Sequence, residues 1–199
     1  MTWVLLAVIV VLLIVIGVLL ARQQRSRKLQ DDFGPEYGRV VAERGDQHSA
    51  EQELSRRRQR LDQFEIRPLE PAARERYAQQ WGVVQRSFVD DPEQAVGESH
   101  VLVQQVMHDR GYPVDEDFEQ RSADLSVKHP DVVENYRAAH AISVSAQKGQ
   151  ANTEQLRQSM VHFRALFDDL LAPGDAAPSD DHDHGDQSAR NFTRADERR

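Results

Sequence analysis

The stretch that decides the fold is LRQSMVHFRALFDDLL, residues 156–171. Its large apolar residues recur at alternating intervals of four and three: Leu156, Met160, Phe163, Phe167 and Leu170. An α-helix has 3.6 residues per turn, so this spacing places them on one helix face. Asn152 or Thr153 can cap the first turn, and Pro173-Gly174 stops the helix. The stretch therefore predicts an amphipathic helix with one buried face.

Between Pro68 and this helix, the sequence shows further apolar stripes with helical spacing. The further stripes are Tyr77, Trp81, Val84 and Phe88; Ala95, Ser99, Leu102, Val103 and Val106; and Val133, Tyr136, His140 and Ser143 or Val144. Residues 115–125 can add a short helix. No window alternates at period two, so the sequence predicts an all-α fold. We expect a bundle of about four helices in residues 68–172, with antiparallel neighbours.

Turn and capping residues separate these stripes. Asp91 fits an N-cap, followed by Pro92 at the first helical position. His129-Pro130-Asp131 repeats that starting pattern. Gly111 and Gly149 are natural helix ends, because glycine adopts the left-handed conformation that terminates many helices.

Residues 29–67 form a polar segment before the bundle. Gly34-Pro35 is expected to break the preceding helix. A thin helical stripe follows: Ala50, Leu54, Arg57, Leu61 and Phe64. It fits either an arm packed on the bundle or a short self-associating coil. Two heptads are too few to indicate a coiled coil, so the arm is favoured.

The N-terminal segment WVLLAVIVVLLIVIGVLLA, residues 3–21, contains no charged residue. A helix of this length spans roughly 28 Å, close to the hydrocarbon thickness of a bilayer. A cleaved signal peptide is the competing interpretation. However, the apolar run is too long for one, and Leu19 and Ala21 make a poor cleavage site. Residues 1–28 are therefore expected to be a transmembrane anchor with a basic flank.

That flank contains Arg22, Arg25, Arg27 and Lys28. The positive-inside rule places such residues in the cytoplasm. We therefore expect a single-pass protein of the bacterial cytoplasmic membrane, with its N-terminus outside and its soluble domain in the cytoplasm. A secreted or extracytoplasmic domain is the alternative. The same charges can contact anionic headgroups, although their effect on topology is a sufficient explanation.

Composition excludes several kinds of function. The chain has no cysteine, which rules out disulfides, thiolate metal sites and a cysteine nucleophile. Its net charge of -8 argues against nucleic-acid binding. Residues 173–199 are acidic and almost free of large apolar side chains, so they are expected to be disordered. Asp181-His182-Asp183-His184 can contact a divalent metal, but a solvated tail explains it more simply.

The sequence lacks the motifs of common catalytic and cofactor sites. It has no phosphate-binding glycine loop, nucleophile elbow, H-E-x-x-H motif or Glu-x-x-His pair. His100, His108, His140 and His162 are better interpreted as core or surface residues than as catalytic groups. We therefore expect no enzymatic activity, no catalytic or metal-binding residues and no cofactor.

Two segments are candidates for partner binding. Arg56, Arg57 and Arg58 form the strongest basic run of the soluble part, although nearby acidic residues favour a self-compensated helix face. Arg110 and Tyr112 lie in a loop, where we expect an exposed arginine beside an aromatic ring. Turn chemistry around Gly111 explains that loop without a partner.

Four segments carry a resemblance to a known family. They are WGVVQRSFVDDPEQAV, LVQQVMHDRGYP, HPDVVENYRAAHAI and LRQSMVHFRALFDDLL. The chain resembles a family of uncharacterised bacterial proteins, described as hypothetical, secreted or membrane proteins. The resemblance covers roughly residues 33–171 and is most specific at residues 88–95. It implies a bacterial, helical, non-enzymatic protein and supplies no activity or site residues.

Three functions fit the sequence. The first is a membrane-anchored interaction or scaffold module that binds a partner protein or self-associates. The second is a helical bundle that binds a small ligand or lipid at the membrane surface, in a cavity lined by Trp81, Tyr136 and Phe163. The third is an unrecognised enzyme, which would require a concave site with two titratable groups that perturb each other.

Overall fold

The computed structural model describes residues 2–173, and every regular element in that range is a helix. Between residues 2 and 20, it describes only the side chains of Trp3, Ile9, residues 12–17, Leu19 and Leu20. The helices are α1 (Thr2–Arg44), α2 (Gln47–Leu61), α3 (Pro71–Ser87), α4 (Pro92–Asp109), α5 (Phe118–Lys128), α6 (Val133–Gln147) and α7 (Thr153–Leu171). The all-α prediction is confirmed.

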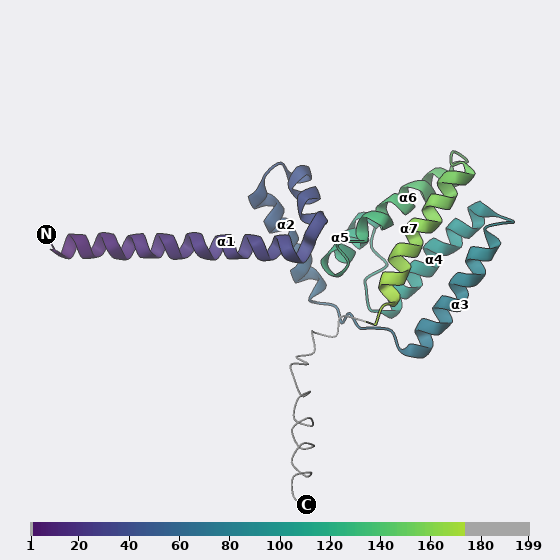
Figure 1. Cartoon of the computed structure of the whole chain (residues 1–199), viewed down its shortest axis with the longest axis horizontal. Helices are drawn as coiled ribbons and strands as arrows, with labels where there is room; N and C mark the ends of the chain where they lie inside the picture. Colours follow the sequence, from purple (N-terminus) through teal and green to yellow (C-terminus); the bar gives the residue numbers. More distant parts are fainter. Residues whose placement is uncertain (1, 174–199) are drawn as a thin grey trace, which may run out of the picture.

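Helices α3, α4, α7 and α6 lie side by side in that order (Figure 1). The short α5 follows α4 in the chain and packs between α6 and α2, so five helices occupy the segment expected to hold about four. The whole α7 stripe is buried, and Phe167 stacks on Trp81 of α3 with ring centroids 4.7 Å apart. Burying such a ring contributes roughly 2–3 kcal/mol, so α7 is the main apolar partner of the bundle.

The helix boundaries follow local chemistry at most positions. Asp91 accepts a hydrogen bond from the Gln94 amide at 3.0 Å, and Asn152 forms a reciprocal capping box with Gln155. Both caps were predicted. The start pattern predicted at His129-Pro130-Asp131 precedes the helix, because α6 begins at Val133 with Val132 at the N-cap and has no side-chain cap hydrogen bond.

Helix α1 kinks at Gly34, where φ is 44° and ψ is -124°, and then continues to Arg44. The predicted break is therefore a kink that only glycine adopts without strain. On both sides of the kink, α1 shares a small apolar core with α2: Leu29, Phe33, Tyr37, Val40, Ala50 and Leu54. Four residues of the α2 stripe are buried, and Phe64 is half-buried after the helix ends.

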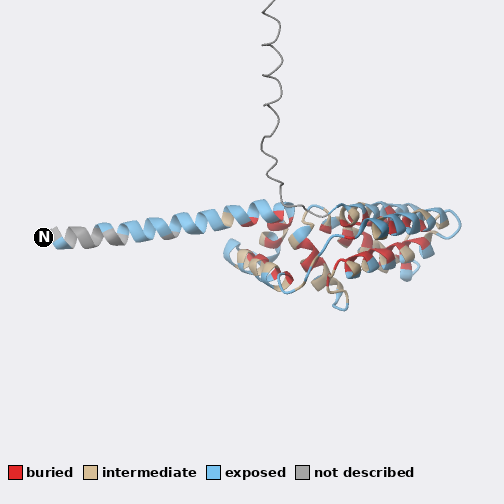
Figure 2. Cartoon of the chain, turned by 90° about the horizontal axis from the view of Figure 1, so that it is seen from below, coloured by how far each residue is buried: buried red, intermediate tan, exposed pale blue. Residues whose placement is uncertain are grey.

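The α1–α2 pair packs on the bundle mainly through α2 against α5. Of the two alternatives left open by the sequence, the packed arm is the one observed. The buried residues are concentrated in the arm and the bundle (Figure 2).

The first half of α1 projects away from the rest of the chain (Figures 1 and 2). Its described apolar side chains are exposed: Trp3, Ile9, Leu12, Leu13, Ile14, Val15, Ile16, Leu19 and Leu20. Among the described residues, no helix combines the length and hydropathy required of a membrane span. The predicted acidic tail with its Asp181–His184 motif lies outside the described residues, apart from Pro173.

Candidate functional site

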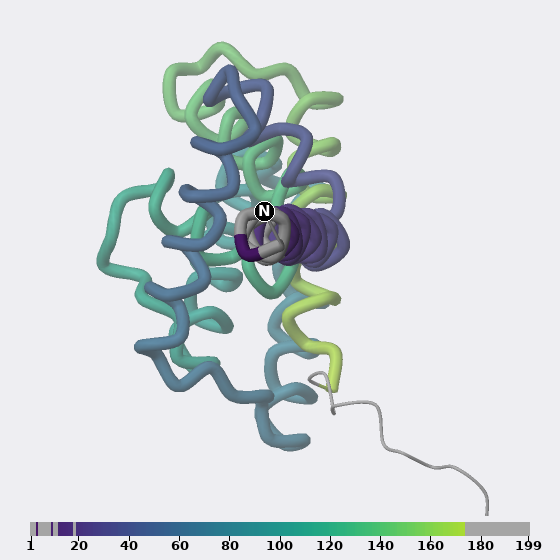
Figure 3. Tube along the Cα trace, turned by 90° about the vertical axis from the view of Figure 1, so that its left-hand side faces the viewer, coloured from purple at the N-terminus to yellow at the C-terminus, as the bar shows by residue number. Residues whose placement is uncertain are grey.

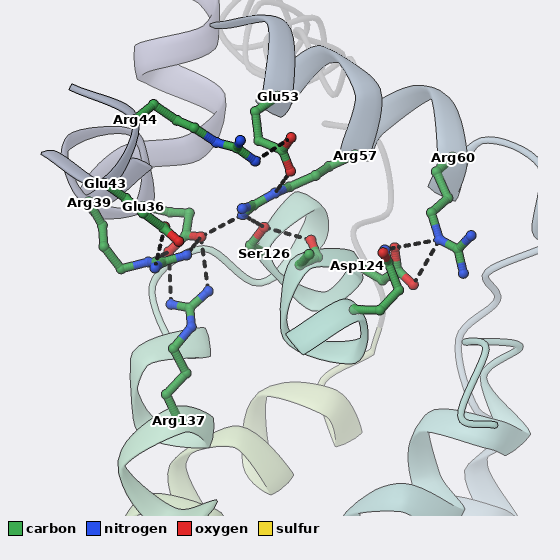
Figure 4. A network of polar contacts seen from close by, with 12 residues as sticks. Glu36, Arg39, Glu43, Arg44, Glu53, Arg57, Arg60, Asp124, Ser126 and Arg137 are labelled. Carbon is green, nitrogen blue, oxygen red and sulfur yellow. Dashed lines mark hydrogen bonds and ion pairs between the residues drawn. The ribbon is translucent and has the colours of Figure 1, made fainter. Parts of the chain in front are cut away.

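The most concentrated polar network of the arm surrounds Glu36, two residues after the kink of α1. Its side chain is only 1% exposed. Three guanidinium groups donate to this carboxylate: Arg39 at 2.8 and 2.9 Å, Arg57 at 2.7 Å, and Arg137 at 2.9 Å through two nitrogens (Figure 4). They come from α1, α2 and α6, so one carboxylate joins the arm to the bundle.

Glu36 is held in its charged form. Burial alone would raise its pKa, but the hydrogen bonds and charges of Arg39 and Arg137 outweigh burial and lower the pKa to about 2. The ionised carboxylate therefore persists at neutral pH. The surrounding cations are themselves paired, since Arg57 also donates to Glu53 at 3.1 Å. The network is best explained as a structural connection.

A second polar contact fixes α2 against α5. Arg57 donates to the Ser126 hydroxyl at 3.2 Å, and Arg60 forms ion pairs with Asp124 at 3.2 Å and Glu116 at 3.0 Å. Asp124 is buried, and its burial raises its pKa despite the charge of Arg60. The arm is thus bound to the bundle at two separate positions.

The predicted partner-binding residues of α2 differ in their surroundings. Arg57 is buried in the Glu36 network, so it is not part of an exposed basic face. Arg58 forms an ion pair with Asp32 at 2.6 Å and lies over the Phe33 ring. Only Arg56 of the three is exposed.

The arginine expected to be exposed in the loop after α4 is buried. Arg110 is 6% exposed and donates to the carbonyls of Leu170 at 3.0 Å and Arg67 at 3.3 Å. Tyr112 is 3% exposed and packs against the core. Because both side chains are engaged within the chain, turn chemistry explains this loop better than partner binding does.

Asp169 of α7 pairs with His129, which lies 40 residues earlier in the chain. The His129 ring lies 6.0 Å from that of Tyr112 and contacts Arg110. These side chains tie the end of α7 to the ends of α4 and α5. Their spacing in sequence gave no indication of this cluster.

Two histidines lie close together beside the core. The rings of His100 and His140 are 5.6 Å apart, with His100 stacked on Phe163 and His140 on Phe118. Burial, together with the charges of His140 and Arg121, lowers the pKa of His100 to about 4. Burial also lowers the pKa of His140. Both imidazoles therefore pack as neutral rings at physiological pH.

Within residues 2–173, no group of three or more metal-binding side chains is arranged to hold an ion. The histidine pair has a ring nitrogen on each side without a hydrogen-bond partner, namely His100 Nε2 and His140 Nδ1. The aromatic rings of Tyr136 and Phe118 pack around them. We therefore assign this pair a packing role.

An open groove lies between α3 and α4, with a volume of about 640 Å³. Val83 and Val101 line it and are 57% and 51% exposed. Its other lining residues are Gln80, Val84, Gln94, Gly97, Glu98, Leu102 and Gln105. No atom lies within 4 Å of where a Gly97 Cβ would stand, so the groove is open above this helix.

The aromatic trio expected to line a ligand cavity does not share one. Tyr136 and Phe163 are fully buried in the core, and neither lines any of the four described clefts. Trp81 lines a separate cleft of about 460 Å³ between α3 and α7.

Comparison of the chain with protein-family models, curated proteins and solved structures finds no match. The resemblance to an uncharacterised bacterial family stays a prediction.

Proposed function

We propose that this protein is a membrane-tethered helical adaptor, which binds an amphipathic helix of a partner protein in the α3–α4 groove. The observation that carries the proposal is the pair of exposed valines, Val83 and Val101, on the walls of that groove. Contiguous exposed apolar surface in a soluble domain often marks an interaction site.

The tether is supported by the uncharged apolar sequence of residues 3–21. The described apolar side chains of this segment are exposed and pack against no other helix. Such exposure is unfavourable in water and favourable in lipid. Arg22, Arg25, Arg27 and Lys28 follow it directly, which favours a cytoplasmic location for the domain.

The chemistry of the groove suits a helix. Residues of α3 and α4 line the groove from its two sides, and Gly97 lets a backbone approach closely because it has no side chain. Gln80, Gln94 and Gln105 supply amide groups at the sides. The only charged lining residue is Glu98, which already accepts a hydrogen bond from Gln94 at 2.7 Å. Apolar anchors with few charges are typical of helix-in-groove recognition.

The position of the groove also suits an adaptor. Helices α3 and α4 lie at the end of the domain farthest from the projecting half of α1 (Figure 1). A tethered domain would therefore present this groove away from the bilayer. The arm network around Glu36 fixes that orientation relative to α1.

The test is site-specific photocrosslinking in cells that express the full chain. A benzophenone amino acid replaces Val101, and the crosslinked peptide is sequenced. We expect a covalent adduct with one amphipathic helix, lost in the Val83→Glu variant. Val89→Glu is the matched control, because Val89 is 84% exposed and lines none of the described clefts.

An adduct that survives Val83→Glu, or that is no stronger than one formed from position 89, contradicts the proposal. An adduct with a second copy of this chain would contradict a foreign partner and would instead indicate self-association through the groove.

A further inference from the structure

A polar cleft lies where α2 crosses α1, just beyond the apolar segment. It has a volume of about 450 Å³ and is lined by Arg22 and Arg25 of α1 and by a row of α2 residues: His48, Glu51, Gln52, Ser55, Arg56 and Gln59. A smaller cleft of about 140 Å³ adjoins it and adds Lys28 and Arg58. The two clefts share Arg25, Ser55 and Gln59.

The cations of this surface are available to a ligand. Among the described residues, Arg22, Arg25, Lys28 and Arg56 take part in no ion pair or hydrogen bond within the chain. All four are exposed. This contrasts with Arg57, one residue along α2, whose guanidinium donates to Glu36, Glu53 and Ser126.

The acidic residue that lines the larger cleft, Glu51, is already occupied. Glu51 accepts hydrogen bonds from Tyr37 at 3.1 Å and Gln47 at 2.8 Å. Despite some burial, these bonds lower its pKa. In the smaller cleft, Asp62 is the acidic residue. Three arginines against one carboxylate leave the larger cleft with an excess of positive charge.

The position of the cleft along α1 is decisive. Arg22 directly follows the apolar segment that ends at Ala21. At about 1.5 Å per residue, Arg22 and Arg25 lie within roughly 6 Å of the end of that segment. The headgroup layer of a bilayer extends roughly 5–8 Å from the hydrocarbon on each side. Seen along α1 from the N-terminus, α2 runs across the helix rather than along it (Figure 3).

We propose that this cleft binds the phosphate of an anionic phospholipid headgroup in the bilayer that α1 enters. The inference rests on the proposed tether. Guanidinium groups match phosphate oxygens with paired hydrogen bonds. Arg22 and Arg25 approach the phosphate from α1, while Arg56 approaches it from α2. Ser55 and Gln59 supply hydrogen bonds for headgroup hydroxyls.

The site unites two basic segments that the sequence presents separately. The flank of the anchor and the arginine run of α2 lie 31 residues apart if measured from Arg25 to Arg56. Their meeting in one cleft explains why Arg56 is left unpaired while its two neighbours are used within the fold. A bound headgroup would hold α2 flat against the membrane surface.

The test uses the full chain in nanodiscs of phosphatidylcholine, with or without a minor fraction of phosphatidylglycerol. The chain has no cysteine, so Gln52→Cys carries one environment-sensitive dye. We expect a blue shift on adding phosphatidylglycerol. Each arginine near a headgroup contributes about fivefold in affinity, so Arg25→Gln with Arg56→Gln should weaken the response about 25-fold. Arg86→Gln, an exposed change on α3, is the control.

The outcomes separate the two proposals. If the chain inserts into both nanodiscs but the dye responds equally in each, the headgroup site is wrong and the tether stands. If the chain does not insert, the tether itself fails. If soluble glycerol phosphate produces the same shift in phosphatidylcholine discs, the cleft binds free phosphate and the lipid assignment is overturned. A response unchanged by the two arginine substitutions also overturns it.

Discussion

Arg137 of α6 donates two hydrogen bonds of 2.9 Å to the two carboxylate oxygens of Glu36 in α1, across a separation of 101 residues. This bidentate pair is the most distant contact of the arm network. Both side chains are largely shielded from solvent, with exposed fractions of 15% and 1%. The contact sets how the bundle is held on the helix that projects from it, and hence where the α3–α4 groove is presented.

Replacing Glu36 with glutamine should strongly destabilise the protein. The change removes the buried anion that Arg57 and Arg137 share, and removing one partner of a buried ion pair typically costs about 3–5 kcal/mol. The free energy of unfolding is measured by urea titration of the full chain in detergent, in a Trp3→Phe background where Trp81 is the only tryptophan.

Glu43→Gln is the control for that measurement. Glu43 pairs with Arg39 at 3.0 Å, but its side chain is 57% exposed, so we expect a change below about 1 kcal/mol. If the two substitutions lowered the free energy of unfolding equally, the burial of Glu36 would make no contribution to stability.

Stability should fall as the pH drops from 6.5 toward 4. The pKa of His100 is about 4 in the folded protein, below its ordinary value of 6.5, so the unfolded chain takes up this proton first. Protonation therefore favours unfolding in that window, by up to about 2–3 kcal/mol. The same titration at several pH values checks this.

His100→Phe should reduce that pH dependence, because phenylalanine keeps a ring against Phe163 and cannot be protonated, while the lowered pKa of His140 leaves part of the slope. A slope that persists unchanged in the variant would assign the acid sensitivity to other groups. The loss of stability caused by protonation of Glu36 occurs at lower pH, between 4.5 and 2, because its pKa in the folded protein is about 2.

Gly111→Ala should destabilise more than Gly149→Ala. Both glycines have positive φ, 92° and 64°, so both changes strain the backbone by about 1 kcal/mol. At Gly111, an added Cβ would also stand 2.3 Å from the Glu65 carbonyl oxygen, whereas nothing lies within 4 Å at Gly149. Thermal unfolding followed by circular dichroism compares them. Similar midpoints for the two variants would mean that residues 62–66 move aside freely.

The sequence was sufficient for the helices, because their determinants are local. The four-three spacing from Leu156 to Leu170 and the caps at Asp91 and Asn152 depend on residues within a few positions of each other. The start of α6 was not predicted, because no local capping signal marks it. Val132 takes the N-cap place without a side-chain hydrogen bond, so no capping residue marks it.

The polar contacts were not predictable, because each joins residues far apart in the chain. Glu36 lay in a segment described only as polar, and Arg137 on a helix described by its apolar face. Arg110 looked exposed beside Gly111 and Pro113, yet its acceptor is the Leu170 carbonyl, 60 residues away. The two basic segments of the α1–α2 cleft were both recognised, but only the kink at Gly34 and the crossing of α2 bring them together.

The most direct test of the account asks whether the chain is held in the membrane with its domain inside the cell. Val89→Cys introduces one exposed thiol on the loop between α3 and α4 of a chain that has no other cysteine. Intact bacteria are treated with a membrane-impermeant maleimide, and their membranes are then washed with alkaline carbonate. The account predicts that the chain stays in the membrane pellet and that the thiol is labelled only after lysis. Release of the chain into the carbonate wash would contradict the tether, and labelling in intact cells would contradict the cytoplasmic location.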